Sequence, residues 1–155
     1  MPWVDHIGSA LSIVISNAAR RPAENARTMS FDHDRLDVYQ RALELLDLVD
    51  RVVEQMPAGR AHLKDQLDRA ATSIILNVAE GAGEYSPADK HRFYRMARRS
   101  ATESAAVLDI IQRRGHSAPD LLQQARDLLV RIVSMLIRMS QGGDRARVAG
   151  NGNRS

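Results

Sequence analysis

The sequence predicts an all-α protein, an antiparallel up-down-up-down four-helix bundle. Apolar residues recur at three- and four-residue steps in four successive segments, which is the period of one helix face. Only 4% of the residues are aromatic, and the abundance of Ala, Leu, Val and Ile favours interlocking helices over a sheet. The breaks between the segments are roughly 3 to 8 residues long, which is typical of antiparallel neighbours.

The length of 155 residues is that of a single domain, and it suffices to bury a core without disulfides or metals. Cysteine is absent, which excludes a disulfide framework, a thiolate nucleophile and a Cys-ligated metal, and which suits a reducing cytoplasm. We expect the bundle over residues 31–141. A disordered or partly helical extension precedes it over residues 1–30, and a disordered basic tail follows over residues 142–155.

The N-terminal extension contains one apolar run, residues 10–16, which is too short to cross a bilayer. Asp5 precedes this run and the arginines at 20–21 follow it, which reverses the order of a secretory signal. We therefore expect no membrane contact. A further hypothesis places the natural start of translation at Met29, since recognisable sequence begins at Phe31.

The first helix is expected from about Asp34 to Met56. Its apolar stripe consists of Leu36, Tyr39, Leu43, Leu46, Val49, Val53 and Met56. Asp34 is the predicted N-cap, and Asp37 lies in the first turn, where the helix dipole favours an anion. Pro57 and Gly59 end this helix.

The second helix is expected from about Arg60 to Glu80. Its main stripe is widened by small and branched neighbours, and the whole set is Leu63, Leu67, Ala70, Ala71, Ile74, Ile75, Val78 and Ala79. Gly81 and Gly83 are expected to end the helix, because glycine enters a left-handed C-terminal turn without steric cost. This glycine pair is typical of a helix end, since a phosphate loop would need a preceding strand.

The third helix has a clear start signal, with Ser86 as N-cap, Pro87 at the first helical position and Asp89 at the third. Gly115 ends it. Small residues in its inner stripe allow a neighbouring backbone to come close, and the stripe consists of Phe93, Ala97, Ser100, Ala101, Ser104, Leu108 and Ile111.

The fourth helix is expected to begin at Ser117, with Pro119 and Asp120 in its first turn, and to end before the glycines at 142–143. It carries two adjacent apolar stripes. The first is Leu121, Ala125, Leu128, Ile132, Leu136 and Met139, and the second is Leu122, Leu129, Val133 and Ile137. Together they are wider than one bundle needs, so we expect the surplus to be buried against another subunit.

The net charge of +3 is weak evidence for a basic binding face, because the excess lies outside the predicted bundle. The excess lies in residues 1–30 and 142–155, while the middle of the chain is neutral overall. Within this middle, residues 31–56 hold seven acidic and three basic side chains, and residues 87–114 hold seven basic and three acidic ones. The first and third helices could therefore attract each other, within one subunit or between subunits.

The basic run on the third helix is the predicted nucleic-acid-binding set. Arg92, Arg95 and Arg99 share one face at i, i+3 and i+7, and Lys90 and Arg98 flank them. Such a stripe could track a phosphate backbone, because guanidinium groups match phosphate geometry. A solvated face, or one that pairs with the acidic first helix of a neighbour, explains the same pattern.

Asn77 and Glu80 are unusual because they lie three residues apart at the end of a strongly apolar stretch. Buried polar groups must be hydrogen-bonded. The simpler expectation is that these two side chains are satisfied by one another, by the following turn, or by polar neighbours at Ser73, Ser100 and Glu103. The alternative is a pocket or recognition site at this turn.

No motif in the chain indicates catalysis or metal binding. A di-iron bundle needs inward Glu-x-x-His pairs, and the sequence has none; the HExxH and GxSxG motifs are also absent. No two histidines are four residues apart, and the histidines are His6, His33, His62, His91 and His116. We therefore expect a non-enzymatic protein without metal or cofactor.

The segment from about Phe31 to Met139 resembles the four helix bundle proteins, also known as 23S rRNA intervening sequence proteins. The matching motifs have the right mutual spacing: Leu36-Asp37-Val38-Tyr39-Gln40-Arg41-Ala42; Gln66-Leu67-x-Arg69-Ala70-Ala71-x-Ser73-Ile74 and Asn77-Val78-Ala79-Glu80-Gly81; then Phe93, Ala97, Ser100 and Glu103. Members usually have glycine where this chain has Arg99. The structural signature, which looks like a code for packing and turn formation, is Ser73, Asn77, Glu80, Gly81, Ser100 and Glu103.

The resemblance implies an assembly and no reaction. Members are similar in fold and form closed rings, typically homopentamers, and no enzymatic activity is established for them. A relative is the accessory variability determinant of diversity-generating retroelements, which works with a reverse transcriptase and nucleic acid through a basic surface. Together with the basic third helix, the basic tail and the absence of cysteine, this resemblance leads to our hypothesis of a cytoplasmic homo-oligomer. It binds nucleic acid, expected to be structured RNA, or a ribonucleoprotein through the third helix and the tail. A protein–protein scaffold without nucleic acid is the alternative.

Overall fold

The computed structural model describes the backbone of residues 30–150 and the side chains of residues 30–141. A short 3-10 helix, η1 (Asp32–Arg35), precedes four α-helices, which are α2 (Asp37–Gln55), α3 (Ala61–Gly83), α4 (Pro87–Arg113) and α5 (Pro119–Gly150). The described residues contain no strand. The predicted all-α four-helix bundle is confirmed, and the expectations for residues 1–29 lie outside the described part of the chain.

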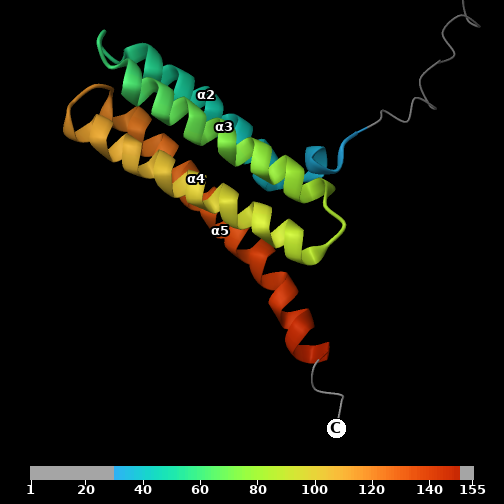
Figure 1. Ribbon diagram of the computed structural model, residues 1–155. Coiled ribbons are helices and arrows are strands. Elements are labelled where there is room, and N and C mark those ends of the chain that lie inside the picture. The colour runs from blue at the N-terminus through green and yellow to red at the C-terminus, as the bar shows by residue number, and fades with distance from the viewer. Residues whose placement is uncertain (1–29, 151–155) are drawn as a thin grey trace, which may run out of the picture. The chain divides into compact units, whose positions relative to one another are not determined.

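Each helix packs against two of the other three. α3 lies between α2 and α4, and α5 lies between α4 and α2, so that α2 and α4 occupy one diagonal of the bundle (Figure 1). The short turns between successive helices make neighbours antiparallel. This order matters for function because it places the most acidic helix, α2, and the most basic helix, α4, where they do not pack on each other.

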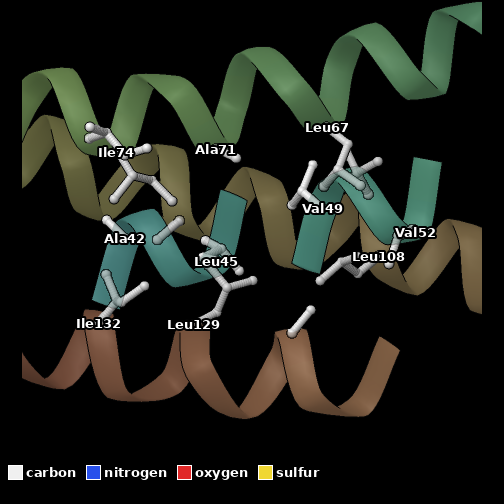
Figure 2. Close-up of a cluster of buried hydrophobic side chains, with 14 of the residues drawn as sticks. Ala42, Leu45, Val49, Val52, Leu67, Ala71, Ile74, Leu108, Leu129 and Ile132 are labelled. Carbon is white, nitrogen blue, oxygen red and sulfur yellow. The ribbon is translucent and has the colours of Figure 1, made fainter. Parts of the chain in front are cut away.

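The apolar stripes meet in one core. Leu45 of α2, Leu67 of α3 and Ile132 of α5 are fully buried. Figure 2 shows the α2 side chains lying between those of α3 and α5. Burying one such side chain contributes about 1.5–3 kcal/mol, so the repeated contacts along the bundle supply most of the force that holds the helices together.

The buried face of α2 is rotated relative to the predicted stripe. Its buried residues are Val38, Ala42, Leu45, Val49 and Val52. The predicted positions Leu36, Leu43 and Leu46 are only partly buried and pack on the edges of the core. The reason is that α2 packs in the groove between α3 and α5. The apolar surface of α2 is broad, and the sequence period alone does not show which part of it faces this groove.

The prediction that Asp34 caps the first helix is wrong. Asp34 belongs to η1, where its Oδ2 accepts the N–H of Phe31 at 2.8 Å. The N-cap of α2 is Leu36, which has an extended backbone and makes no side-chain cap. Asp37 lies in the first turn as predicted. An acidic residue can start either kind of helix, so the sequence did not reveal the inserted 3-10 turn.

The prediction that Gly81 ends the second helix is also wrong. α3 continues through Gly81 to Gly83, and the positive-φ glycines among the described residues are Gly59 (φ 80°) and Gly115 (φ 63°). Gly81 is buried against α4, where an added Cβ would lie 2.7 Å from Cε1 of Tyr94. This glycine is needed for the close approach of two helices and not for a turn.

The boundaries of α4 are as predicted. Ser86 Oγ accepts the N–H of Asp89 at 3.5 Å, and Pro87 occupies the first position. At the other end, the left-handed Gly115 donates its N–H to Gln112 O at 3.0 Å, and His116 donates to Ile111 O at 3.1 Å. This pair of bonds satisfies two carbonyls that the helix end would otherwise leave free.

α5 differs from the prediction at both ends. It begins at Pro119, and the Ser117 hydroxyl donates a hydrogen bond to Gln55 Oε1 of α2, with an Oγ–Oε1 distance of 2.7 Å. At the other end the backbone stays helical to Gly150, beyond the glycines at 142–143, because each glycine costs only about 1 kcal/mol in a helix. Residues 151–155 lie outside the described part. None of the described helices has the length and apolar character needed to cross a bilayer.

Candidate nucleic-acid interface

The five cationic residues predicted as a binding set all lie on α4. The opposite side of α4 is made of small and apolar residues that pack on α3 and α5. Burial of that side turns Arg92, Arg95, Arg98 and Arg99 outward, where they are exposed, and leaves Lys90 half-buried. We call these five residues the α4 basic face.

The arginines of the α4 basic face follow the helix axis. Arg92, Arg95 and Arg99 rise by about 4.5 and 6 Å along the axis at 1.5 Å per residue, and Arg98 lies to one side of this row. The Arg92 guanidinium carbon lies 5.2 Å from the centre of the Phe93 ring, a cation–π contact at the edge of the core. The face is therefore a row of charges on a rigid, packed helix.

Within the described part of the chain, the side chains of the α4 basic face make no ion pair. The arginines that do so are elsewhere: Arg41 pairs with Glu44 at 2.6 Å on α2, and Arg126 of α5 pairs with Asp109 of α4. The donors of the α4 basic face thus remain available to an external anion.

Pairing between the acidic first helix and the basic third helix does not occur within one subunit, because α2 and α4 do not pack on each other. Asp47, Asp50 and Glu54 of α2 are exposed and make no ion pair or hydrogen bond in the region that the structure describes. Two oppositely charged surfaces on a diagonal of the bundle are therefore both open.

The polar signature residues form a link between α3 and α4. Ser73 Oγ lies 2.9 Å from Ser100 Oγ across the two helices. Asn77 Nδ2 donates to Ser73 O at 2.7 Å and to Ser73 Oγ at 3.1 Å. Ser100 Oγ also reaches the carbonyl of Met96 at 3.2 Å. These three residues satisfy one another, as the simpler of the two sequence interpretations expected.

The two acidic signature residues behave differently from the serines and the asparagine. Glu103 accepts a hydrogen bond from Gln66 Nε2, which links α4 to α3 one turn further along. Glu80 is exposed, and its carboxylate has no hydrogen-bond partner among the described residues. Glu80 thus takes no part in the network, contrary to the expectation that all five polar residues satisfy one another or the turn.

Sequence reasoning missed an aromatic stack at the start of α2. The rings of Phe31 and His33 are stacked, with an interplanar angle of 6° and a distance of 5.4 Å between ring centroids. The His33 and Tyr39 rings are tilted by 53°, and their centroids are 4.5 Å apart. The sequence does carry three rings in this segment, at Phe31, His33 and Tyr39. Their spacing does not match one helix face, so the pattern did not predict that they stack. Tyr94, by contrast, is buried beside Gly81, and burial raises the pKa of its phenol.

Within the described part of the chain, no group of three or more His, Asp or Glu side chains is arranged to hold a metal ion. A hollow at the C-terminal end of α4 is lined by Asp109, Ile110, Arg113 and Arg114. The Asp109 carboxylate pairs with Arg126, so Arg113 and Arg114 are the charged groups of this hollow that remain open to a ligand. Positive charge therefore occurs near both ends of α4.

Comparison with known proteins gives a family and a fold. The family model described as 23S rRNA-intervening sequence protein matches residues 34–138. One similar solved structure is the crystal structure of a protein with unknown function from the S23 ribosomal protein family of Bacteroides thetaiotaomicron VPI-5482. It is 20% identical with a TM-score of 0.62, over 67% of this chain and 98% of that chain. At this identity the likeness shows the fold alone. No curated protein matches the sequence.

Proposed function

Since this chain belongs to the 23S rRNA-intervening sequence protein family, we propose that it is a non-enzymatic, homo-oligomeric protein that binds structured RNA through the α4 basic face. The observation that carries the proposal is the exposure of Arg92, Arg95, Arg98 and Arg99 on one helix, without an ion pair in the described residues. The family description concerns sequences that interrupt 23S rRNA, which makes RNA the first ligand to test.

The α4 basic face suits a phosphate backbone for a physical reason. Guanidinium groups bind phosphate through two parallel hydrogen bonds, and each phosphate that is neutralised releases counterions into solution. The arginines do not first have to break an internal ion pair, so binding retains this gain. Because α4 is packed along its inner side by α3 and α5, the row also keeps its spacing when the ligand arrives.

A charge-reversal pair tests the site directly. Arg95→Glu on α4 should weaken binding to a structured 23S rRNA fragment by about tenfold or more, in line with the 1.5–3 kcal/mol of a charged hydrogen bond. Arg51→Glu on α2 is the matched control, because Arg51 is also exposed and makes no ion pair in the described region. A gel shift near 50 mM salt compares both; equal losses would argue against a site on α4.

The homo-oligomer, of which the resemblance suggests a pentamer, is supported by apolar side chains left outside the core. Leu76 of α3 is 56% exposed, Met96 of α4 is 42% exposed and Val130 of α5 is 64% exposed. Contact between copies would remove this surface from water. Light scattering of the purified full chain tests the assembly, and a single-copy mass would contradict it.

A protein–protein scaffold is the second candidate, and the open acidic surface of α2 favours it. In this account the carboxylates of α2 in one copy pair with the α4 basic face of the next. Replacement of Arg92, Arg95 and Arg99 by Glu separates the two candidates. An oligomer that falls apart assigns these charges to assembly, whereas one that persists but loses RNA assigns them to binding.

A further inference from the structure

One end of the bundle combines exposed aromatic rings with the first cations of the α4 basic face. Phe31 is 72% exposed and Tyr85 is fully exposed. Phe31 borders η1, which packs on α3, and Tyr85 lies in the turn that joins α3 to α4. Lys90 and Arg92 occupy the first turns of α4. Figure 1 shows η1 and the α3–α4 turn at the same end of the bundle.

The Phe31 ring is held in place although it is exposed. It stacks on His33, which in turn packs on Tyr39 of α2. Its backbone N–H donates to Asp34 Oδ2 at 2.8 Å, and its carbonyl accepts the N–H of Asp34 at 3.1 Å. The result is a short ladder of rings that starts in the bundle and ends in an exposed phenyl group.

Exposed rings of this kind are costly to leave in water, and proteins that bind single-stranded nucleic acid use them as stacking platforms. Unpaired bases stack on aromatic side chains while nearby cations hold the phosphates that join them. The bases of a continuous duplex are stacked inside the helix and cannot use such a platform. The combination of rings and cations therefore selects among kinds of RNA.

Building on the proposed RNA binding, we propose that this end of the bundle binds unpaired bases. One base extends the Phe31–His33–Tyr39 ladder, another stacks on Tyr85, and Lys90 and Arg92 hold phosphates of the same strand. The ligand class is accordingly RNA with a single-stranded loop or end next to a helical stem, with the remaining arginines of the α4 basic face on the stem.

The experiment compares two labelled RNAs with the full chain at one low salt concentration. One is a hairpin with an unpaired loop, and the other is a blunt duplex with the same stem sequence. The hairpin should bind more tightly than the duplex. Phe31→Ala and Tyr85→Ala should each weaken hairpin binding by roughly 5- to 150-fold, the range that one lost base stack produces, with little change for the duplex.

Matched variants separate stacking from simple apolar contact. Phe31→Trp and Tyr85→Phe keep a ring and should keep the preference for the hairpin, whereas Tyr85→Leu keeps apolar area and should lose it. Gln124→Ala, at an exposed position on α5 away from the rings and the α4 basic face, should change neither affinity. Thermal melts of every variant confirm that the bundle is intact.

The outcomes distinguish this inference from the function on which it rests. If wild-type protein binds both RNAs equally, or if Tyr85→Leu binds the hairpin as well as wild type does, the stacking platform is wrong while RNA binding stands. If wild-type protein binds neither RNA, the proposed function itself fails. A preference for the hairpin that disappears only in the variants without a ring supports the platform.

Discussion

Gly81 sets the distance between α3 and α4. Its missing side chain leaves room for Tyr94 and Phe93 of α4, whose nearest carbons would lie 2.7 and 3.1 Å from an added Cβ. Gly83 is also helical, but a Cβ at that position would meet nothing within 4 Å. The two glycines have the same backbone and different surroundings, so they test the role of the close approach.

We expect Gly81→Ala to lower the free energy of unfolding by about 1–3 kcal/mol, because a methyl group must displace packed ring atoms. Gly83→Ala should raise it by about 0.4–1 kcal/mol, because alanine loses less backbone entropy and meets no obstacle. Urea denaturation measures both. A Gly81→Ala variant as stable as wild type would mean that Tyr94 moves aside at no cost.

His116 lies in the turn between α4 and α5, and its surroundings shift its pKa. Its Nε2 is buried and has no hydrogen-bond partner among residues 30–141. Burial lowers the pKa of His116, and the positive charges of Arg60 and Arg114 lower it further. The unfolded chain, whose histidine pKa is about 6.5, therefore binds a proton more readily than the folded protein does.

This shift fixes the sign of a pH effect. Between the folded pKa of His116 and about pH 6.5, the unfolded state binds more protons, so the free energy of unfolding should fall as pH is lowered through that window. His116→Gln should flatten this part of the profile. Urea denaturation from pH 5 to 8 provides the measurement; identical profiles for wild type and His116→Gln would contradict the assignment.

At the level of elements, the sequence identified the four helices but not every partner of their ends. Local signals were reliable where the partner is local, as for the Ser86 cap and the Gly115 turn. They failed at Gly81 and Ser117, whose partners lie on α4 and on α2. A distant partner leaves no trace in local spacing, so only the packed bundle shows it.

The candidate site divides in the same way. The spacing of Arg92, Arg95 and Arg99 is enough to place them on one helix face. The spacing does not show whether these arginines pair with the carboxylates of α2. That depends on the order of helices around the bundle, which places α2 and α4 on a diagonal. The proximity of Phe31 to the α3–α4 end likewise depends on how η1 packs on α3, and no sequence motif announces it.

Gln55 ties the end of α2 to the start of α5, and this tie is testable. Its Oε1 accepts both the Ser117 hydroxyl at 2.7 Å and the Ala118 N–H at 2.9 Å. We expect Gln55→Ala to lower the free energy of unfolding by about 1–2 kcal/mol through the loss of two hydrogen bonds. Gln55→Glu keeps the acceptor and adds an anion at the start of α5, so its stability should match or exceed that of wild type. Denaturation curves in which Gln55→Ala also matches wild type would show that the tie is incidental.

Across the whole bundle, charge is separated onto opposite corners. The outer face of α2 carries exposed carboxylates such as Asp47 and Asp50, and the outer face of α4 carries exposed arginines. An approaching polyanion is attracted to one corner and repelled from the other, so the protein's field should orient RNA toward α4 before contact. This separation explains why a chain whose middle segment has no net charge can still present an exposed basic surface on α4.

Salt dependence measures how many phosphates that surface contacts. If the four arginines of the α4 basic face each neutralise one phosphate, log K should fall with log salt with a slope of about −3 to −4. A slope near zero at any affinity would mean that binding does not depend on the phosphate backbone.

The most direct test of the account combines this slope with the Arg92, Arg95 and Arg99 to Glu variant. Filter binding of a structured RNA is measured between about 50 and 200 mM salt for wild type and variant, with light scattering to confirm that assembly is unchanged. We predict that the variant remains assembled, binds far more weakly, and has a slope about three units shallower, since each lost phosphate contact removes about one. A variant that keeps both the affinity and the slope of wild type would show that RNA, if bound, is bound elsewhere.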